Sequence, residues 1–550
     1  MEKRTAENPS RLSLRGLEWA TAFLLTLVVI SLHVMAATSG GALWRDEANT
    51  VAVATLPHLG DVWNNLQSDS FPILWLVIIR EFSALFGPMN DQAFRALGFV
   101  IGVGVVAALW LNARVFGHAL PVVSLALLGM SPSMIRWGDT VRAYGFGVFL
   151  ILVTCAMLWR FLERPGAARF VVAALAAVAS VHVLYYNAVL LLALCAGGVA
   201  VCVGRRAWKQ AVAVVSIGAL AAISLAVYVP LILQMRSWNA IVRMPDYTFG
   251  WFWTKLGEAL RPGGSWTIVV WCAVLLLALA AGLIAVGRPG TMSLSKPRRE
   301  VVLFSLVTLL VGVPGNYLFL KTLSYYTSPW YYLSLLVLTA LCVDALLGAL
   351  ITTPRARIAR IASVLILLVA TLIPTRRAVR TRLTNVDLLA ARLEAATVPG
   401  DLVLVSPWHY GVSFSRYYNG AAASMTVPPL ASPRIVRYDL VVERMGMRDQ
   451  TAPVQPVAER VVQTLKGGHR VFVVGILLLP DSGDRPLLLP PVSTASRSLP
   501  EGAYTNQWLM LVGEVIQRHA VRIAPIHVDA DRVVSRYENL SIQVAEGWRP

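Results

Sequence analysis

The chain has 550 residues, 57% of them hydrophobic, and a mean hydropathy of +0.63. This composition excludes a soluble protein folded around ordinary cores, because so apolar a chain needs a bilayer as its solvent. The formal charge of +18 could suggest nucleic-acid binding. The basic residues cluster in short loops between apolar runs, however, so they indicate topology, and we expect no nucleic-acid partner.

Apolar runs near the length of a spanning helix, about 20 residues, recur from Leu17 through Pro374. From Thr375 onward the chain carries scattered charges, many prolines and only short apolar runs. We therefore predict a transmembrane domain over residues 1–375 and a folded aqueous domain over residues 376–550. The first run, Leu17 to Ala37, follows a basic segment as a signal peptide would, but it is long enough to span, so we expect it to be retained.

Basic loops determine the predicted topology, since positively charged loops stay in the cytoplasm. Three apolar runs lie between Pro72 and Met134, and only two of them can be full crossings if the later clusters are to stay inside. About eleven crossings follow, within a range of 11–13 helices, with a cytoplasmic N-terminus and a periplasmic or extracellular second domain on the inner (plasma) membrane. The clusters are Lys3 to Arg15, Arg160 to Arg169, Arg205 to Lys209, Arg288 to Arg299 and Arg355 to Arg360.

Helix and strand patterns alternate in the second domain, which predicts an α/β fold. No glycine-rich phosphate loop occurs in it. The predicted elements are an amphipathic helix over Asn385 to Ala396, strands over Asp401 to Val405, Arg470 to Leu478 and Val521 to Val528, and a helix over Gln507 to His519.

Two adjacent carboxylates, Asp46 and Glu47, open the first outer loop. A charge beside the bilayer is costly unless it is used or paired, although acidic residues also simply favour the start of a helix. Neighbours on a helix point about 100° apart, so one of the two, not both, faces a given reacting atom. Apolar positions at near-helical spacing follow and predict one helix lying on the membrane surface: Val51, Leu56, Leu59, Val62 and Leu66.

Three short motifs stand in order near the N-terminus: Arg45-Asp46-Glu47-Ala48, then Asp69-Ser70-Phe71-Pro72-Ile73-Leu74-Trp75, then Ser131-Pro132 followed by Arg142-Ala143-Tyr144. Together they resemble the GT-C glycosyltransferases of the protein O-mannosyltransferase and aminoarabinose-transferase superfamily, over about the first third of the chain. Ser70-Phe71-Pro72 departs from the His-Pro-Pro of many relatives. Their late Arg-Tyr pair is matched here only by Ser324-Tyr325-Tyr326, with Lys321 nearby.

The resemblance implies transfer of a hexose or pentose from a polyprenyl-phosphate carrier to an acceptor hydroxyl at the outer membrane face. The acceptor could be a lipid, a polysaccharide or a protein, and membrane lipids are the remaining partners. Asp46 matches the family's first acidic residue and is the candidate base in an inverting transfer, because an acceptor hydroxyl must lose its proton. Glu47 is the second choice, or it orients the helix. A divalent metal stays open, since hard cations need several oxygen ligands.

The other candidate contacts to substrate are polar residues on the outer side, and Arg45 and Tyr144 join them as members of the matching motifs. Arg142 and Lys321 could hold the carrier phosphate or snorkel to lipid headgroups. Asp69 could share the acceptor or metal site, or only cap the helix that starts at Pro72. Two further residues, at outer turns, are the candidate sugar contacts His182 and Tyr325, and for His182 a structural role is the commoner alternative.

Two other functions fit many spans with few intramembrane charges. A transporter or flippase of lipid-linked sugars would show repeated halves with broken helices, and the sequence has no such internal symmetry. A non-catalytic GT-C-like binding subunit is the second alternative, and retention of both Asp46 and Glu47 weighs against it.

Overall fold

The computed structural model describes residues 9–117, 120–287, 294–481, 487–493 and 496–550. Parts of two basic clusters, residues 3–8 and 288–293, lie outside the described residues. Within the described ranges nine helices are long and apolar enough to cross a membrane: Leu14–Ser39, Asp91–Phe116, Ala143–Glu163, Asn187–Gly204, Trp208–Met235, Thr267–Gly287, Lys296–Leu323, Pro329–Leu350 and Pro354–Val379.

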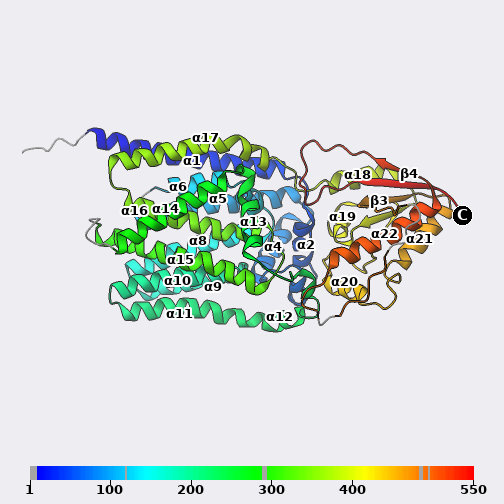
Figure 1. Ribbon diagram of the computed structural model, residues 1–550, viewed down its shortest axis with the longest axis horizontal. Helices are drawn as coiled ribbons and strands as arrows, with labels where there is room; N and C mark the ends of the chain where they lie inside the picture. The colour runs from blue at the N-terminus through cyan, green and yellow to red at the C-terminus, as the bar shows by residue number, and fades with distance from the viewer. Residues whose placement is uncertain (1–8, 118–119, 288–293, 482–486, 494–495) are drawn as a thin grey trace, which may run out of the picture.

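These helices form one bundle with the C-terminal domain at one end of it (Figure 1). The helix α1 (Pro9–Ser39) begins at the far end and finishes beside that domain. The other long helices are α5 (Asp91–Phe116), α8 (Ala143–Glu163), α10 (Asn187–Gly204), α11 (Trp208–Ser224) continuing into α12 (Val229–Met235), α14 (Thr267–Gly287), α15 (Lys296–Leu323), α16 (Leu333–Leu350) and α17 (Pro354–Val379).

Two shorter elements complete the bundle. The helix α9 (Ala167–Val183) packs between α8 and α11. The buried α6 (Val122–Met130), which leads into α7 (Pro132–Gly138), packs against α1, α16 and α17. Asp344 of α16 accepts hydrogen bonds from the backbone N–H and the hydroxyl of Ser124, at 3.1 and 2.9 Å, which lets α6 begin inside the bundle. If α9 and α6 with α7 also cross, the number of crossings is the eleven that the basic loops predict.

The predicted surface helix is two helices, which corrects the sequence analysis. The chain forms α2 (Arg45–Ala54), turns at Pro57 and continues in α3 (Leu59–Asn64). A proline inside a helix removes a hydrogen bond and clashes with the preceding turn, so the apolar spacing does not continue through this point. Val51 and Val62 are buried, whereas Leu59 is exposed.

The helix α4 (Ile73–Phe86) is the short helix that the topology requires between Pro72 and Met134. It packs on α2, and just after its end the carbonyl of Pro88 and the carboxylate of Asp91 accept hydrogen bonds from Arg416 of the C-terminal domain. Both ends of α4 therefore lie on the side of the bundle that carries this domain.

The C-terminal domain is α/β, as predicted, with a five-stranded sheet in the order β2-β1-β3-β5-β4. The strands β2 (Ala423–Thr426), β1 (Leu402–Ser406) and β3 (Val471–Gly475) are parallel, and β5 (Ile542–Trp548) and β4 (Ala520–Ile526) are antiparallel to their neighbours. Side chains alternate between two cores. One faces α20 (Tyr438–Met445), α21 (Gln455–Lys466) and α22 (Glu501–His519), and the other faces α18 (Val386–Ala396) and α19 (Gly411–Tyr417).

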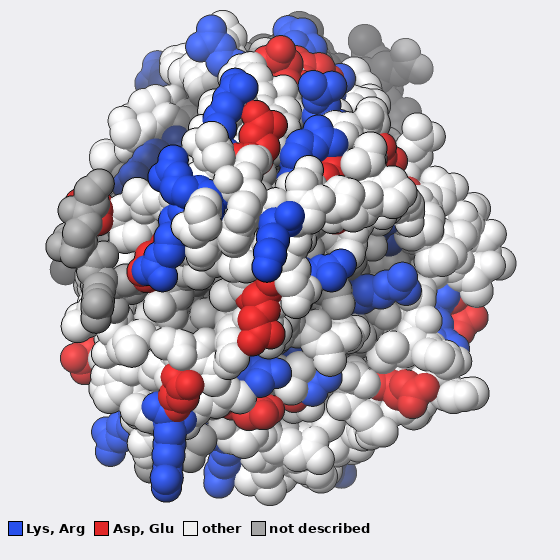
Figure 2. All heavy atoms as spheres, turned by 90° about the vertical axis from the view of Figure 1, so that its right-hand side faces the viewer, with Lys and Arg blue, Asp and Glu red and all other residues white. Residues whose placement is uncertain are grey.

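The far end of this domain carries Lys and Arg side chains interspersed with Asp and Glu (Figure 2). Such a mixed surface is typical of a protein face in water. At the opposite end of the domain, α17 continues through Pro374 to Val379. The basic residues just after position 375 thus belong to the last turn of a bundle helix.

Candidate active site

Glu47 orders the start of α2. Its fully buried carboxylate accepts hydrogen bonds from Arg95 of α5 at 2.6 and 2.9 Å, from the N–H of Val141 at 2.9 Å and from the N–H of Trp44 at 3.2 Å. Both oxygens are therefore saturated. A buried charge needs this pairing, since an unpaired one would cost several kcal/mol. Glu47 joins α2 to α5 and to the segment before α8.

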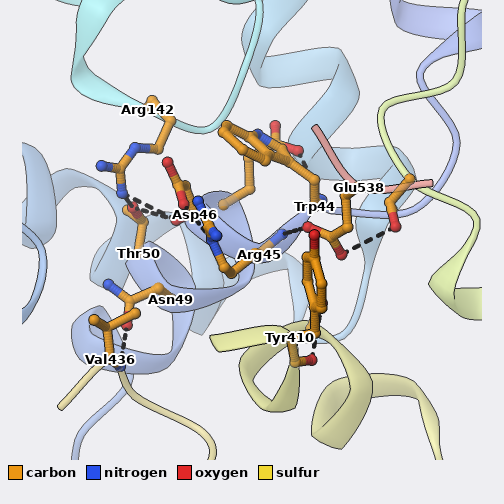
Figure 3. Close-up of polar contacts among 12 residues, drawn as sticks. Trp44, Arg45, Asp46, Asn49, Thr50, Arg142, Tyr410, Val436 and Glu538 are labelled. Atoms are coloured by element: carbon orange, nitrogen blue, oxygen red, sulfur yellow. Dashed lines mark hydrogen bonds and ion pairs between the residues drawn. The ribbon is translucent and has the colours of Figure 1, made fainter. Parts of the chain in front are cut away.

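Asp46, the next residue toward the N-terminus, has a different environment (Figure 3). Its carboxylate accepts one hydrogen bond, from the Arg45 Nε at 2.9 Å, and its side chain is 22% exposed. The backbone carbonyl of Asp46 accepts from Arg142 at 3.0 Å. Of the candidate carboxylates Asp46, Glu47 and Asp69, it is the one that a substrate can reach.

Asp69 and Arg142 form a second buried ion pair beneath α2. Asp69 also accepts hydrogen bonds from Thr50 at 2.9 Å and from Asn49 at 3.1 Å. The same Arg142 guanidinium lies 4.4 Å from the centroid of the Phe71 ring. The helix α4 begins after Pro72, so Asp69 does not cap it. Asp69 instead holds the Arg142 side chain beside Asp46.

Several tyrosines lie near Asp46. The hydroxyls of Tyr144, Tyr331 and Tyr438 all lie close enough to interact electrostatically with its carboxylate. The Tyr144 and Tyr331 ring centroids are 5.9 Å apart, and Tyr186 packs edge-on against Tyr331 at 5.2 Å. Phenol groups can donate hydrogen bonds and can also stack on a sugar ring.

The C-terminal domain contacts α2 from the other side. The carboxylate of Glu538 accepts a hydrogen bond from the backbone N–H of Arg45 at 2.6 Å and from the Thr384 hydroxyl at 3.0 Å (Figure 3). Burial raises the pKa of Glu538 to about 7, while the hydrogen bonds from Ser413 and Arg45 oppose this shift. The hydrogen bonds from Arg45 and Thr384 join Glu538 to the N-terminus of α2 and to the segment before α18, so Glu538 supports the orientation of α2 across the domain boundary.

Asn49 makes a second contact between the domains. Its side-chain oxygen accepts a hydrogen bond from the N–H of Val436 at 2.9 Å (Figure 3). Its amide donates to the carbonyl of Ser68 at 2.8 Å. The helix α19, which follows the β1 strand, packs against α2. The loop at the carboxyl end of β1, where α/β domains often bind ligands, therefore leads toward Asp46.

Three predicted contacts lie outside this group. His182 is engaged by the Tyr228 hydroxyl at 2.9 Å and the Ser224 hydroxyl at 3.0 Å, which is a packing role. Lys321 is exposed in the last turn of α15, and its ammonium group makes no polar contact within the described ranges. Tyr325 is half-buried and lies close to Tyr186, at the edge of the tyrosine cluster.

A cavity of about 710 Å³ lies between the C-terminal domain and the ends of α1 and α5 that face it. Its walls are mostly apolar, with Val34, Ala37 and Phe99 among them, and Arg95 and Arg382 also line it. We predict from the sequence a lipid-facing cleft beside the Asp46 loop, with Arg142 or Lys321 at its mouth. The cavity adjoins that loop at Gly41 and Ala42, but neither Arg142 nor Lys321 lines it.

Metal ligands are not gathered anywhere in the described ranges, since no group of three or more His, Cys, Asp or Glu residues there could hold an ion. Asp69 and Glu47 are each bound to an arginine instead. Each of the three carboxylates is paired with one arginine: Asp46 with Arg45, Glu47 with Arg95 and Asp69 with Arg142.

Several site residues were missed by the sequence analysis. Arg95 stands at the outer end of an apolar run, where an unpaired charge is costly, and this could have identified it as a partner for Glu47. Glu538 and Tyr438 carry no comparable local pattern, because their role depends on how the C-terminal domain docks.

No protein-family model matches the chain, and no curated protein matches it either. Several solved structures have a backbone fold similar to that of this chain. ArnT from Cupriavidus metallidurans in the apo state has a TM-score of 0.49 and 12% sequence identity, covering 82% of this chain and 92% of that chain. For ArnT bound to undecaprenyl phosphate the TM-score is 0.48 and the identity 10%, with 95% and 97% covered.

The Archaeoglobus fulgidus oligosaccharyltransferase, in complex with Zn and sulfate, has a TM-score of 0.45 and 12% identity over 82% of this chain and 67% of that chain. At these identities the likeness concerns the fold alone. All three TM-scores lie below 0.5, so the chemistry of this chain is inferred from its own residues.

Proposed function

We propose that this protein is a membrane glycosyltransferase. It transfers a sugar from a polyprenyl-phosphate carrier to an acceptor hydroxyl at the outer face of the plasma membrane. The observation that carries the proposal is the contrast among the carboxylates at α2. Glu47 and Asp69 are buried and saturated, whereas Asp46 has one hydrogen bond to its carboxylate and a side chain that is 22% exposed.

Asp46 acts as the general base of a single displacement. The acceptor oxygen attacks the anomeric carbon, and its proton passes to the Asp46 carboxylate. The bond from that carbon to the phosphate oxygen breaks, and the polyprenyl phosphate leaves with the electron pair. The sugar is inverted at the anomeric carbon. A phosphate needs little protonation to leave, so the acceptor proton is the one that requires a base.

Arg142 and the tyrosines supply the groups that hold the donor. Arg142 is fixed beside the Asp46 carbonyl at 3.0 Å, and its buried Nε has no hydrogen-bond partner in the described part of the chain. Tyr144 and Tyr331 offer hydroxyls and ring faces to the sugar. Because Asp69 already neutralises Arg142, what Arg142 offers a donor phosphate is the hydrogen bond of its unpaired Nε.

The acceptor approaches from the C-terminal domain, between α2 and the loop that follows β1. Tyr410 and Tyr438 on that side lie close to Arg45, so they are the groups that would align a hydroxyl toward Asp46. The acceptor is a lipid, a polysaccharide or a protein exposed at the outer membrane face.

Transfer can be tested with the purified full-length chain in lipid vesicles. A panel of polyprenyl-phosphate hexoses and pentoses is supplied with membrane extract as acceptor, and release of free polyprenyl phosphate is measured together with the mass of the glycosylated product. We expect one donor to be consumed by the wild-type protein. Movement of intact donor across the bilayer without cleavage would instead establish a flippase, and donor binding without either event would establish a binding subunit.

The proposed location of the site requires a cytoplasmic N-terminus and a C-terminal domain outside the cytoplasm. Protease added to intact spheroplasts should then remove the residues after Val379. Protection in spheroplasts, with cleavage in inverted vesicles, would place Asp46 on the wrong side for this reaction.

A further inference from the structure

The outer end of α17 carries an exposed stripe that changes from apolar to basic. Ile366, Val369 and Ile373 are 68%, 75% and 62% exposed, as expected for side chains that face lipid. The stripe continues on the same face through three exposed arginines, because residues three, four and seven positions apart share one side of a helix. These arginines are Arg376, Arg377 and Arg380, which we name the α17 arginine surface.

The charges of this surface are not neutralised within the protein. None of its three guanidinium groups makes a hydrogen bond or an ion pair in the part of the chain that the structure describes. The neighbouring Arg382 pairs with Asp387 at 2.6 Å, and Arg416 pairs with Asp91 at 2.6 Å. Arginines that join the domains are thus paired, and those on the lipid-facing stripe are left open.

The level of the surface is that of the membrane boundary. The short helix η4 (Arg261–Gly263) packs against α17, and Trp266 follows it with 37% of its side chain exposed. Tryptophan is enriched where hydrocarbon meets headgroups. The transition from exposed isoleucine and valine to arginine on α17 marks the same boundary. A guanidinium at this depth contacts the phosphate oxygens of lipid headgroups and can bind them through bidentate hydrogen bonds.

We propose that the α17 arginine surface binds the headgroups of anionic lipids in the outer leaflet. A helix C-terminus favours one nearby cation, and basic residues on the outer side of a membrane protein are disfavoured in general. Three unpaired arginines on one lipid-facing stripe therefore need a negatively charged partner, and the complementary group at that depth is a lipid phosphate. The bound lipid holds the connection between α17 and the C-terminal domain at the membrane surface, two residues before Arg382. This inference requires the bundle to span a membrane and is independent of the proposed transfer reaction.

The test uses the full-length protein in phosphatidylcholine nanodiscs that contain a trace of phosphatidylglycerol with a photoreactive headgroup. After illumination, the labelled peptides are located by mass spectrometry. We expect the peptide that contains Arg376 and Arg377 to be labelled, and the label to fall by about fivefold for each arginine removed at low salt. A photoreactive phosphatidylcholine should label it weakly, and added salt should reduce the anionic label.

Matched variants separate this site from a general effect of charge. The variant Arg376→Gln with Arg377→Gln and Arg380→Gln should lose the label. The lysine triple, Arg376→Lys with Arg377→Lys and Arg380→Lys, should keep most of it. The control removes three exposed arginines of the C-terminal domain, changes the net charge equally and should label like the wild type: Arg434→Gln, Arg448→Gln and Arg460→Gln.

Two results would overturn the proposal. One is wild-type labelling of the α17 peptide in the glutamine triple. The other is an equal loss of label in the control triple, because lipid contact would then follow net charge alone. If the glutamine triple does not fold, the same labelling is measured on the single variants Arg376→Gln and Arg377→Gln. Unchanged labelling of the α17 peptide in both would also overturn the proposal.

Discussion

Two ion pairs, one at each end of the bundle, differ in burial and in what they connect. At the end away from the C-terminal domain, Glu300 pairs with Arg205 and joins α15 to α10, and both side chains are 16% to 20% exposed. At the other end, Glu47 and Arg95 are 0% and 9% exposed and lie beneath the C-terminal domain. The first pair fastens two helices near water. The second positions the start of α2, where the adjacent carboxylate, Asp46, stays accessible.

The strongest test of this comparison is Asp46→Asn. The change keeps the size and the hydrogen-bonding capacity of the side chain but removes its basicity. We expect turnover to fall by about 10² to 10⁴, the usual contribution of a general base, while donor binding and thermal unfolding change little. Transfer and binding are measured on the same purified sample. Near-normal turnover in the folded variant would remove Asp46 from the mechanism.

Glu47→Ala tests the buried partner of the same helix turn. It leaves Arg95 charged and unpaired inside the protein, so we expect the free energy of unfolding to drop by about 3 to 5 kcal/mol. Thermal unfolding in detergent gives the measurement. Glu47→Gln should be milder than Glu47→Ala, since it keeps the side-chain volume and its single amide oxygen still accepts a hydrogen bond from the N–H of either Val141 or Trp44. If Glu47→Gln abolished transfer in a stable protein while Asp46→Asn did not, the base would be Glu47.

Glu538 tests the contact between the domains through its pH dependence. Its pKa is raised from about 4.5 to about 7 on folding, so the folded protein holds a proton there that the unfolded chain has released. The contribution of this group to stability is therefore complete below about pH 4.5 and is lost as the pH rises through 7. The shift corresponds to about 3 kcal/mol.

We expect Glu538→Gln to lack this component, which is measured as the difference in thermal stability between pH 5 and pH 8. The exposed Glu546 of β5 supplies the control, and Glu546→Gln should keep the wild-type dependence. An identical pH dependence in Glu538→Gln and the wild type would show that Glu538 is ionised throughout.

Glu300→Gln should have the smallest effect. The pair with Arg205 is partly exposed, so its loss should cost about 1 kcal/mol or less and leave transfer unchanged. Thermal unfolding and turnover are compared with those of Glu47→Gln. A loss of stability as large as that of Glu47→Ala would mean that the Glu300–Arg205 pair stabilises the protein as much as the Glu47–Arg95 pair does.

The sequence predicts those features that depend on local patterns. Alternating basic loops predict the bundle and the short α4, and strands such as β1 and β3 appear at the expected positions because their apolar runs are bounded by turns. Pro57 divides the predicted surface helix. The prediction used only the spacing of apolar residues, which takes no account of a proline that interrupts a helix. The pairing of Glu47 with Arg95 and of Arg45 with Glu538 joins distant segments. The apolar run beside Arg95 indicates that this residue needs a partner but does not identify Glu47, and Glu538 has no comparable local pattern.

The hydrogen bond from Arg45 to Glu538 also has a consequence for biosynthesis. The two residues are 493 positions apart, so α2 is made among the first segments of the chain and its N-terminal partner among the last. The helix that carries Asp46 acquires this support only after the whole bundle has been made and the C-terminal domain has folded against it. A chain that stops before residue 538 has every candidate side chain of the membrane domain, yet lacks one contact that orients them. Completion of synthesis and assembly of the site are therefore coupled.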